Sequence, residues 1–312
     1  MSEGTRSDIS VTEPGRLAWI FGSSRSGSTW LLRMLSRLER VIPIDDPHLG
    51  HHLGVWRPIP LAWATAKDPP KLGTLADYKR QKRDYLFSDR YRDAWVPQLR
   101  GLISARFEAQ ASEQAGGVDR PIVVVKEPGS HVADTIMELF PSSALIFLLR
   151  DGRDVVDSWL DAYRDGSWAT GEGAYPVDDG SRGPLIRWQS SVWLHRTEVV
   201  QKTFARTDPS RRVLIRYEEM RADPVDALER ICRPLEIDAS RGELERIARE
   251  NEFSRVPGSR KGAGREIRRA RPGGWASHMS DEEIEAMHDI LADKLSELGY
   301  LRPGELRKRR AA

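Results

Sequence analysis

Residues 17–32 read LAWIFGSSRSGSTWLL: a short apolar run, a loop of glycines and small hydroxyl side chains, and an apolar pattern of helical spacing. Gly22, Gly27 and Thr29 reproduce the G-x-x-x-x-G-K-[ST] spacing of a phosphate-binding loop, in which backbone N–H groups at the start of a helix hold a phosphate. Ser28 stands where that pattern has the lysine that reaches the outer phosphates of a triphosphate. The stretch therefore predicts a strand, a phosphate-binding loop and a helix, with a poor fit for a nucleoside triphosphate.

Strand and helix patterns alternate along the chain, which predicts the fold class. Strands are expected at residues 17–21, 122–125, 145–149 and 213–216. Helices are expected at residues 29–38, 132–140, 152–163, 185–205 and 225–235. Ser280 and Glu283 form a capping box that opens a last helix, closed by Gly299. We therefore expect an α/β fold, a doubly wound parallel sheet with flanking helices and ligand at the carboxyl ends of the strands.

The domain organisation is expected to be simple, because no Pro/Gly/Ser-rich linker divides the 312 residues. We expect a flexible tail at residues 1–15, one domain over residues 16–300 and a basic tail at residues 301–312. Residues 47–118 are less regular and are expected to form an acceptor-binding lid, with a charged helical stretch at residues 77–92.

Composition limits the partners and the compartment. The net charge of +2 with 31% charged residues provides no basic field for nucleic acid. A single cysteine, Cys232, excludes an internal disulfide and suits the cytosol. No apolar run approaches the roughly 20 residues of a membrane span, and the first residues do not read as a targeting peptide. We expect a cytoplasmic protein without nucleic-acid or membrane partners, and the sequence leaves the oligomeric state open.

Four motifs in family order resemble those of sulfotransferases that use 3′-phosphoadenosine-5′-phosphosulfate (PAPS). They are SRSGSTW at residues 24–30, an apolar run into RDGRDVVDS at 145–158, YEEMRADP at 217–224, and RKG at 260–262 followed by GW at 274–275. The resemblance implies in-line transfer of a sulfuryl group from PAPS to a hydroxyl of a small-molecule acceptor. The product of the donor is adenosine 3′,5′-bisphosphate (PAP), and the reaction needs no metal.

The resemblance also assigns the residues around the 5′-phosphosulfate. Arg25 would neutralise this group and stabilise charge on the bridging oxygen as the S–O bond lengthens. Backbone N–H groups and hydroxyls would come from Ser26, Gly27, Ser28 and Thr29.

The rest of the donor is assigned in the same way. Trp30 would stack on adenine and Tyr217 would contact it, and the alternative for each is a place in the core. The 3′-phosphate would be held by Arg150, Ser158, Arg260, Lys261 and the backbone of Gly262. Arg153 and Asp154 are interpreted as a structural ion pair or as residues of a helix start, and Trp275 as a residue that packs the nucleotide loop.

The motifs leave the catalytic base open, although transfer to a hydroxyl needs a group that takes its proton. Lys126 matches the lysine of the K-T-H-L-P element of aryl and steroid sulfotransferases, but Glu127-Pro128 follows it in place of the family's histidine. Other branches of the family place a glutamate after the first helix, where this chain has PIDDPH at residues 43–48. We favour Asp46 as the base, and the alternatives are Glu127, His48 and His131.

Three other hypotheses are weighed against this one. The spacing of His48, His51 and His52 invites a zinc site, but no nearby cysteine or fourth ligand is evident. A small-molecule P-loop kinase would share the first strand and loop, but would need the missing lysine and a Mg²⁺ aspartate. A non-catalytic nucleotide-binding module would keep the phosphate-binding residues and lose the base.

The acceptor is the least determined part of the prediction. Trp56, Pro58, Pro60 and Trp63 lie in an irregular stretch with Pro69-Pro70, which favours an aromatic or apolar small molecule. Carbohydrate and lipid hydroxyls stay open as alternatives.

Overall fold

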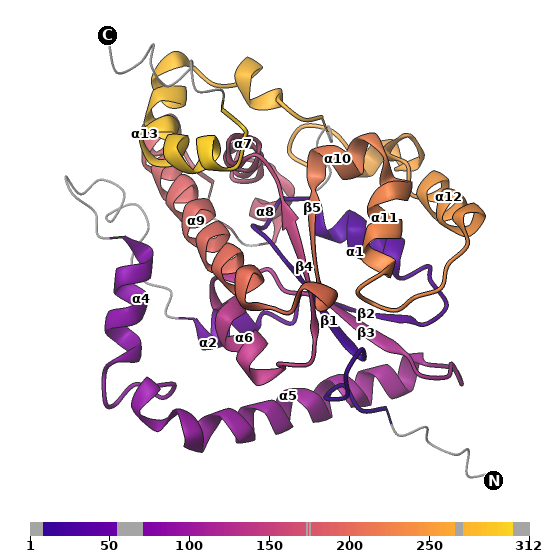
Figure 1. Cartoon of the computed structure of the whole chain (residues 1–312). Helices are drawn as coiled ribbons and strands as arrows, with labels where there is room; N and C mark the ends of the chain where they lie inside the picture. The colour runs from indigo at the N-terminus through magenta and orange to yellow at the C-terminus, as the bar shows by residue number, and fades with distance from the viewer. Residues whose placement is uncertain (1–8, 55–70, 173, 175, 266–270, 302–312) are drawn as a thin grey trace. The chain divides into compact units, whose positions relative to one another are not determined.

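A computed structural model describes residues 9–54, 71–172, 174, 176–265 and 271–301. Its centre is a five-stranded parallel sheet in the order β2-β3-β1-β4-β5 (Figure 1). The strands are β1 (Leu17–Phe21), β2 (Val41–Asp45), β3 (Ile122–Lys126), β4 (Ala144–Leu149) and β5 (Arg212–Arg216). Strands β2 and β3 lie on one side of β1, and β4 and β5 lie on the other side. The predicted doubly wound parallel sheet is confirmed.

Helices connect and flank the strands. In the described residues they are α1 (Ser28–Leu35), α2 (Leu49–Leu53), α4 (Leu72–Arg80), α5 (Arg92–Gln114), α6 (Ala133–Leu139), α7 (Gly152–Ala162), α8 (Trp168–Gly171), α9 (Asp179–Arg206), α10 (Tyr217–Ala222), α11 (Pro224–Cys232), α12 (Arg241–Glu250) and α13 (Asp281–Glu297). The predicted capping box of Ser280 and Glu283 is present at the start of α13.

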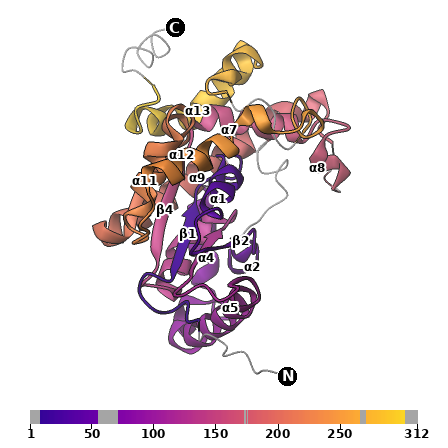
Figure 2. The ribbon, with the colours of Figure 1, turned by 90° about the vertical axis from the view of Figure 1, so that its right-hand side faces the viewer.

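The two faces of the sheet are covered by different sets of side chains. On one face, Ala18 and Ile20 of β1 belong to an apolar core that includes residues of α1, α11 and α12. On the other face, Trp19 stacks on Phe21 and contacts Phe107 of α5. This alternation is the period of two expected of a strand. Helices α1, α11 and α12 lie to the right of the sheet in Figure 1 and face the viewer in Figure 2.

Some predicted helix bounds are wrong. Residues 77–92 do not form one helix, because α4 ends at Arg80 and the Ser88 hydroxyl caps a separate 3-10 turn before α5. Helix α11 ends at Cys232 instead of continuing to residue 235, since Pro234 has no N–H and restricts the residue before it. Strand β2 and the extent of α5 were not predicted.

The described chain forms two compact units. The first, the sheet unit, consists of the described parts of residues 1–55, 77–149 and 198–252. The second unit consists of the described parts of residues 56–76, 150–197 and 253–312. No helix in the described part of the chain is both long and apolar enough to cross a membrane.

Parts of three sequence predictions lie outside the described residues. These are residues 1–8 of the predicted N-terminal tail, residues 302–312 of the C-terminal tail, and residues 55–70 of the predicted lid with their tryptophans and prolines.

Candidate active site

The phosphate-binding loop, residues 22–27, leaves the carboxyl end of β1 and leads into α1. At Gly22 the loop passes so close to β4 that a Cβ would lie 2.2 Å from the Leu148 carbonyl oxygen. Gly27 is the N-cap of α1 with φ of 91°, and a Cβ there would lie 2.6 Å from the Tyr217 ring. Arg25 also has a left-handed backbone, with φ of 73°. Such a backbone costs a non-glycine residue about 1–3 kcal/mol and is typical of functional sites.

The start of α1 has the properties of an anion site. Its first turn contains no acidic side chain, and the first N–H groups of a helix have no acceptor within it. The positive end of the helix dipole adds to this preference for an anion. Ser26 is 1% exposed, and its hydroxyl has no hydrogen-bond partner among the described residues. A bound anion would satisfy this buried hydroxyl, which otherwise destabilises the fold.

The segment after β3 holds the phosphate-binding loop in place. The Ser130 hydroxyl accepts a hydrogen bond from the Gly22 N–H at 2.9 Å and donates one to the Gly22 carbonyl oxygen. The Ser24 hydroxyl donates to the Pro128 carbonyl oxygen at 3.4 Å. These contacts fix the loop from the neighbouring strand, so that a ligand need not order it.

Lys126, the last residue of β3, joins the first turn of α1 to the end of β2. Its side chain is 7% exposed, and its ammonium donates to the Thr29 hydroxyl at 2.8 Å. The same nitrogen lies 2.6 Å from Asp45 Oδ1 and 2.9 Å from Asp46 Oδ2. An ammonium has three N–H donors, and these three acceptors match them. Two carboxylates around one cation leave the cluster with a surplus of negative charge beside the phosphate-binding helix.

Glu127 is a buried carboxylate that holds the chain beyond Asp46. It accepts hydrogen bonds from the backbone N–H groups of Leu49 at 2.8 Å, Gly50 at 3.2 Å and Gly129 at 2.6 Å. Burial raises the pKa of Glu127, and these three N–H groups oppose the shift. Two of the three donors are at the start of α2 and the third is Gly129. Glu127 therefore fixes the position of α2 against the segment that follows β3.

The histidines near this cluster lie in two places. His131 is buried, and its ring fits against Gly54, where a Cβ would lie 2.1 Å from Nε2. His48 is exposed, and its ring centroid lies 5.1 Å from that of His51. Within the residues that the structure describes, no group of three or more His, Cys, Asp or Glu side chains is arranged to hold a metal ion.

Trp30 and Tyr217, the predicted adenine contacts, lie together beside the phosphate-binding loop. Their rings meet edge to face, with centroids 6.4 Å apart. The Trp30 indole donates to the Asn251 carbonyl oxygen at 2.9 Å and packs partly against the apolar core. Tyr217 is 4% exposed. Both residues therefore have packing roles in the sheet unit, and Trp30 retains a half-buried ring.

In the second unit, Arg150 lies two residues before α7, next to the N-cap Asp151. Its side chain is 11% exposed, and its guanidinium lies 3.9 Å from Asp154. The carbonyl oxygen of Arg150 accepts from the Trp193 indole at 3.2 Å. At Gly152 a Cβ would lie 2.8 Å from the same indole ring. The turn that carries Arg150 is therefore fixed by close packing on α9.

Arg153 and Asp154 lie in the first turn of α7, in agreement with the second of the two sequence interpretations, and they do not pair with each other. The Arg153 guanidinium pairs with Asp151, at 2.7 Å between Nη2 and Oδ2, and lies over the Trp275 ring at 4.4 Å. Asp154 instead accepts from the Gly273 N–H at 2.8 Å, and burial raises the pKa of Asp154 while Arg150 opposes the shift. Both residues are structural, because each connects α7 to the segment around Trp275.

The other predicted 3′-phosphate residues are also in the second unit. Ser158 lies in α7 and is 8% exposed. Arg260 ends a 3-10 turn and is exposed. The Lys261 ammonium lies 3.5 Å from the carbonyl oxygen of Phe253. Gly262 has φ of 123°, and a Cβ there would meet nothing within 4 Å.

Sequence reasoning missed two members of the site. Ser130 could not be selected, because its contact with Gly22 joins residues 108 positions apart. Asp45 was passed over in favour of Asp46, although both contact Lys126. The run VIPID at residues 41–45 was the available signal for β2, since a strand there places both aspartates at the carboxyl edge of the sheet.

Comparisons with known proteins agree with this geometry. The model of the Sulfotransferase family matches residues 18–241. The structure is similar to mouse sulfotransferase SULT7A1 complexed with PAP, at 14% identity and a TM-score of 0.53, covering 92% of this chain and 87% of that chain. It is also similar to the sulfotransferase domain of the Synechococcus PCC 7002 olefin synthase, at 17% identity and a TM-score of 0.50, covering 92% and 98%. No curated protein matches the chain significantly by sequence.

Proposed function

This chain belongs to the sulfotransferase family, and from that premise we propose that PAPS is its sulfuryl donor and a small-molecule hydroxyl its acceptor. One observation supports the chemistry most directly. The Lys126 ammonium connects Thr29, in the first turn of the phosphate-binding helix, to Asp45 and Asp46. An anion site and a carboxylate that can take a proton thus meet at the same edge of the sheet.

In the proposed reaction, the acceptor oxygen attacks sulfur and forms the new S–O bond, while the bond from sulfur to the 5′-phosphate oxygen breaks. The electron pair of the broken bond remains on that oxygen, so PAP leaves as an anion. Arg25, Ser26 and the N–H groups of α1 would stabilise the leaving charge, since charge stabilisation at the leaving oxygen lowers the barrier. Holding the two reactants in line would supply the rest of the rate enhancement.

Asp46 is the base that we favour. Its Oδ2 is held by Lys126, while its Oδ1 is buried and has no hydrogen-bond partner among the described residues. A hydroxyl donor would satisfy this oxygen and could pass its proton to it. The alternatives are still Glu127, which accepts from three backbone N–H groups, His131 and His48.

The rest of the donor would be bound as the family motifs imply. Trp30 and Tyr217 would contact adenine. The 3′-phosphate would be bound by Arg150, Ser158, Arg260, Lys261 and the backbone of Gly262. A cytoplasmic location and an aromatic or apolar acceptor complete the proposal; the single cysteine supports the first.

The family membership does not favour the kinase hypothesis, and nucleotide preference tests the donor. We expect PAP to raise the melting temperature, with about 2.7 kcal/mol of stabilisation at 100 times its Kd. ATP with Mg²⁺ should stabilise much less, because the loop has Ser28 in place of the lysine. An equal response to both nucleotides would contradict the proposal.

Transfer is tested with labelled PAPS and a panel of phenolic, steroid, sugar and aliphatic alcohols. Appearance of a labelled sulfate ester supports an enzyme. Stabilisation by PAP without transfer to any acceptor would instead indicate a nucleotide-binding module.

A further inference from the structure

Three arginines precede three neighbouring strands of the sheet. Arg16 comes directly before β1, Arg40 directly before β2, and Arg120 two residues before β3. Because β2, β3 and β1 are adjacent and parallel, their amino ends meet at one edge. The Arg16 carbonyl oxygen accepts from the Val123 N–H at 2.8 Å, and the Arg40 carbonyl oxygen from the Ile122 N–H at 2.7 Å. The sheet itself therefore fixes where these arginines lie.

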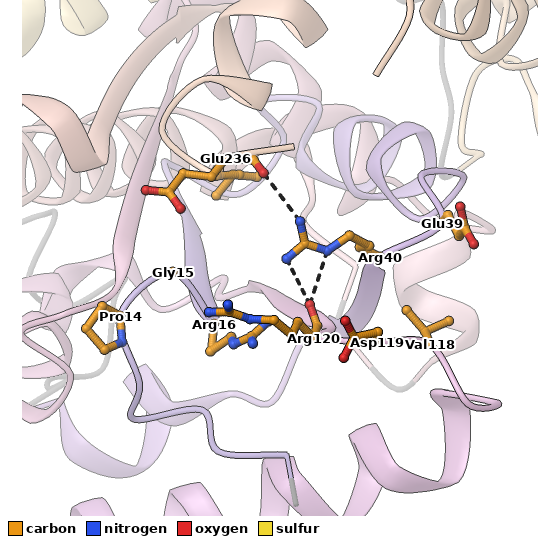
Figure 3. A pocket seen from close by; sticks show the side chains of 10 residues that line it. Pro14, Gly15, Arg16, Glu39, Arg40, Val118, Asp119, Arg120 and Glu236 are labelled. Carbon is orange, nitrogen blue, oxygen red and sulfur yellow. Dashed lines mark hydrogen bonds between the residues drawn. The ribbon is translucent and has the colours of Figure 1, made fainter. Parts of the chain in front are cut away.

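The three arginines surround a cavity of about 430 Å³ (Figure 3). Its other lining residues include the carboxylates Glu39, Asp119 and Glu236. These three carboxylates and Arg120 are exposed, whereas Arg16 is buried. Exposed charges are screened by water and salt. The phosphate-binding loop is at the opposite, carboxyl end of the same strands, about 17 Å away for a five-residue strand.

The guanidinium of Arg16 is the unusual group in this cavity. The residue is 7% exposed, and its Nη1 has no hydrogen-bond partner among the described residues. Its ion pair is a 3.7 Å contact from Nε to Glu13, whose side chain is 59% exposed. Burial, then the charge of Arg120, lowers the pKa of Arg16, while Glu13 and Asp119 oppose the shift. A buried guanidinium whose nearest carboxylate is exposed and 3.7 Å away is stabilised further by a second anion.

The neighbouring arginine is held in a fixed position. Arg40 donates from Nε and Nη2 to the Arg120 carbonyl oxygen, at 3.2 and 3.0 Å, and from Nη1 to the Glu236 carbonyl oxygen at 3.4 Å (Figure 3). Carbonyl acceptors orient this guanidinium without neutralising it. The cavity thus has one oriented guanidinium, that of Arg40, beside the buried guanidinium of Arg16.

We propose that this cavity binds a small molecule through a phosphate or sulfate group, at a site separate from the one for the sulfuryl donor. A planar guanidinium recognises such oxyanions with parallel N–H bonds, and the orphaned Nη1 of Arg16 supplies a donor that no described residue uses. The lining holds three guanidinium groups and three carboxylates, so the buried Arg16 guanidinium, and not the net charge of the cavity, would select the oxyanion. The volume suits an anionic group with a small organic part.

The proposal is tested with inorganic phosphate and sulfate as probes, against chloride at equal ionic strength. The melting temperature is measured with PAP present at saturation, so that PAP occupies the donor site. The variants are wild type, Arg16→Met and, as control, Arg246→Met, which removes an exposed arginine paired with Glu250 on α12. We expect phosphate, sulfate or both to stabilise wild type and the control, and at least a tenfold weaker apparent affinity in Arg16→Met. Phosphate alone would assign a phosphate ester, and sulfate alone a sulfate ester.

Equal stabilisation of all three proteins, as a general salt effect would give, would overturn the proposal. If Arg16→Met does not fold, a selenate soak of wild-type crystals answers the question. Anomalous density beside Arg16 supports the site, and its absence at saturating selenate overturns it. If PAP itself does not bind, the titration is carried out on Arg25→Ala, so the two proposals fail independently.

Discussion

Asp45 and Asp46 show how two adjacent carboxylates on one cation can differ in environment. Both contact the Lys126 ammonium. Asp45 ends β2 and its side chain is 56% exposed, whereas the Asp46 side chain is 38% exposed and its backbone is left-handed with φ of 49°. Only Asp46 has a carboxylate oxygen that is buried and lacks a hydrogen-bond partner in the described part of the chain. This difference predicts different effects of the same substitution.

Asp46→Asn should lower kcat about 10²–10⁴-fold, the usual contribution of a general base, with PAP affinity nearly unchanged. The matched control is Asp45→Asn, which removes the negative charge of the other contact to Lys126. An exposed ion pair contributes at most about 1 kcal/mol, so this control should lose no more than about fivefold. The measurement is steady-state transfer from PAPS with the Kd for PAP from calorimetry.

Equal losses in the two variants would mean that the charge around Lys126 matters and that Asp46 is not the base. Near-normal kcat in Asp46→Asn, with transfer abolished by Glu127→Gln or His131→Ala, would assign the base to the segment after β3.

At the scale of elements, the close approach of β1 and β4 requires a glycine at the start of the phosphate-binding loop. A Cβ at Gly22 would lie 2.2 Å from the backbone carbonyl oxygen of Leu148, and strand backbones cannot move aside as a flexible side chain can. Gly101, within α5, has nothing within 4 Å of the equivalent position. The same substitution should therefore have opposite effects at these two glycines.

Gly22→Ala should lower the free energy of unfolding by about 1–3 kcal/mol, the usual range for overpacking, and weaken PAP binding because the loop must shift. Gly101→Ala should raise the free energy of unfolding by up to about 1 kcal/mol, because alanine is the better helix former. Denaturant unfolding of both variants, with a PAP titration, checks the pair. Wild-type stability in Gly22→Ala would contradict the observed spacing of β1 and β4.

At the scale of the whole molecule, the residues proposed to bind the donor are distributed over both units. The phosphate-binding loop and Tyr217 belong to the sheet unit, while Arg150 and Ser158 belong to the second unit. Arg150 follows β4 directly in the chain, so the segment of the second unit that carries it begins where a strand of the sheet unit ends.

Arg150→Ala should weaken PAP binding by about 1.5–3 kcal/mol, the scale of a hydrogen bond to a charged group. The comparison ligand is adenosine 5′-phosphate, which lacks the 3′-phosphate and should bind wild type and Arg150→Ala alike. Arg187→Ala, an exposed arginine of α9, is the control. Calorimetry measures each Kd, and melting without ligand confirms folding, because Asp154 loses a cation. An unchanged preference for PAP over adenosine 5′-phosphate would contradict the assignment of the 3′-phosphate to Arg150.

The sequence by itself determined the features that depend on short stretches of chain. The strand at residues 17–21, the glycine spacing that follows it and the capping box at Ser280 each depend on local periodicity or on backbone freedom at named positions. The alternation of strands and helices then predicts a parallel sheet with ligand at its carboxyl edge. Those features did not require knowledge of distant contacts.

Only the tertiary structure decided which distant residues meet. Parallel strands are joined by long crossovers, so neighbours in the sheet are far apart in sequence. The pairing of β2 with β3 brings Asp45 and Asp46 to Lys126, and the contact of β3 with the loop brings Lys126 to Thr29, 97 positions away. That pairing, together with the pairing of β1 with β3, gathers Arg16, Arg40 and Arg120 at the opposite edge. No local periodicity encodes these contacts, because each depends on the order of strands in the sheet.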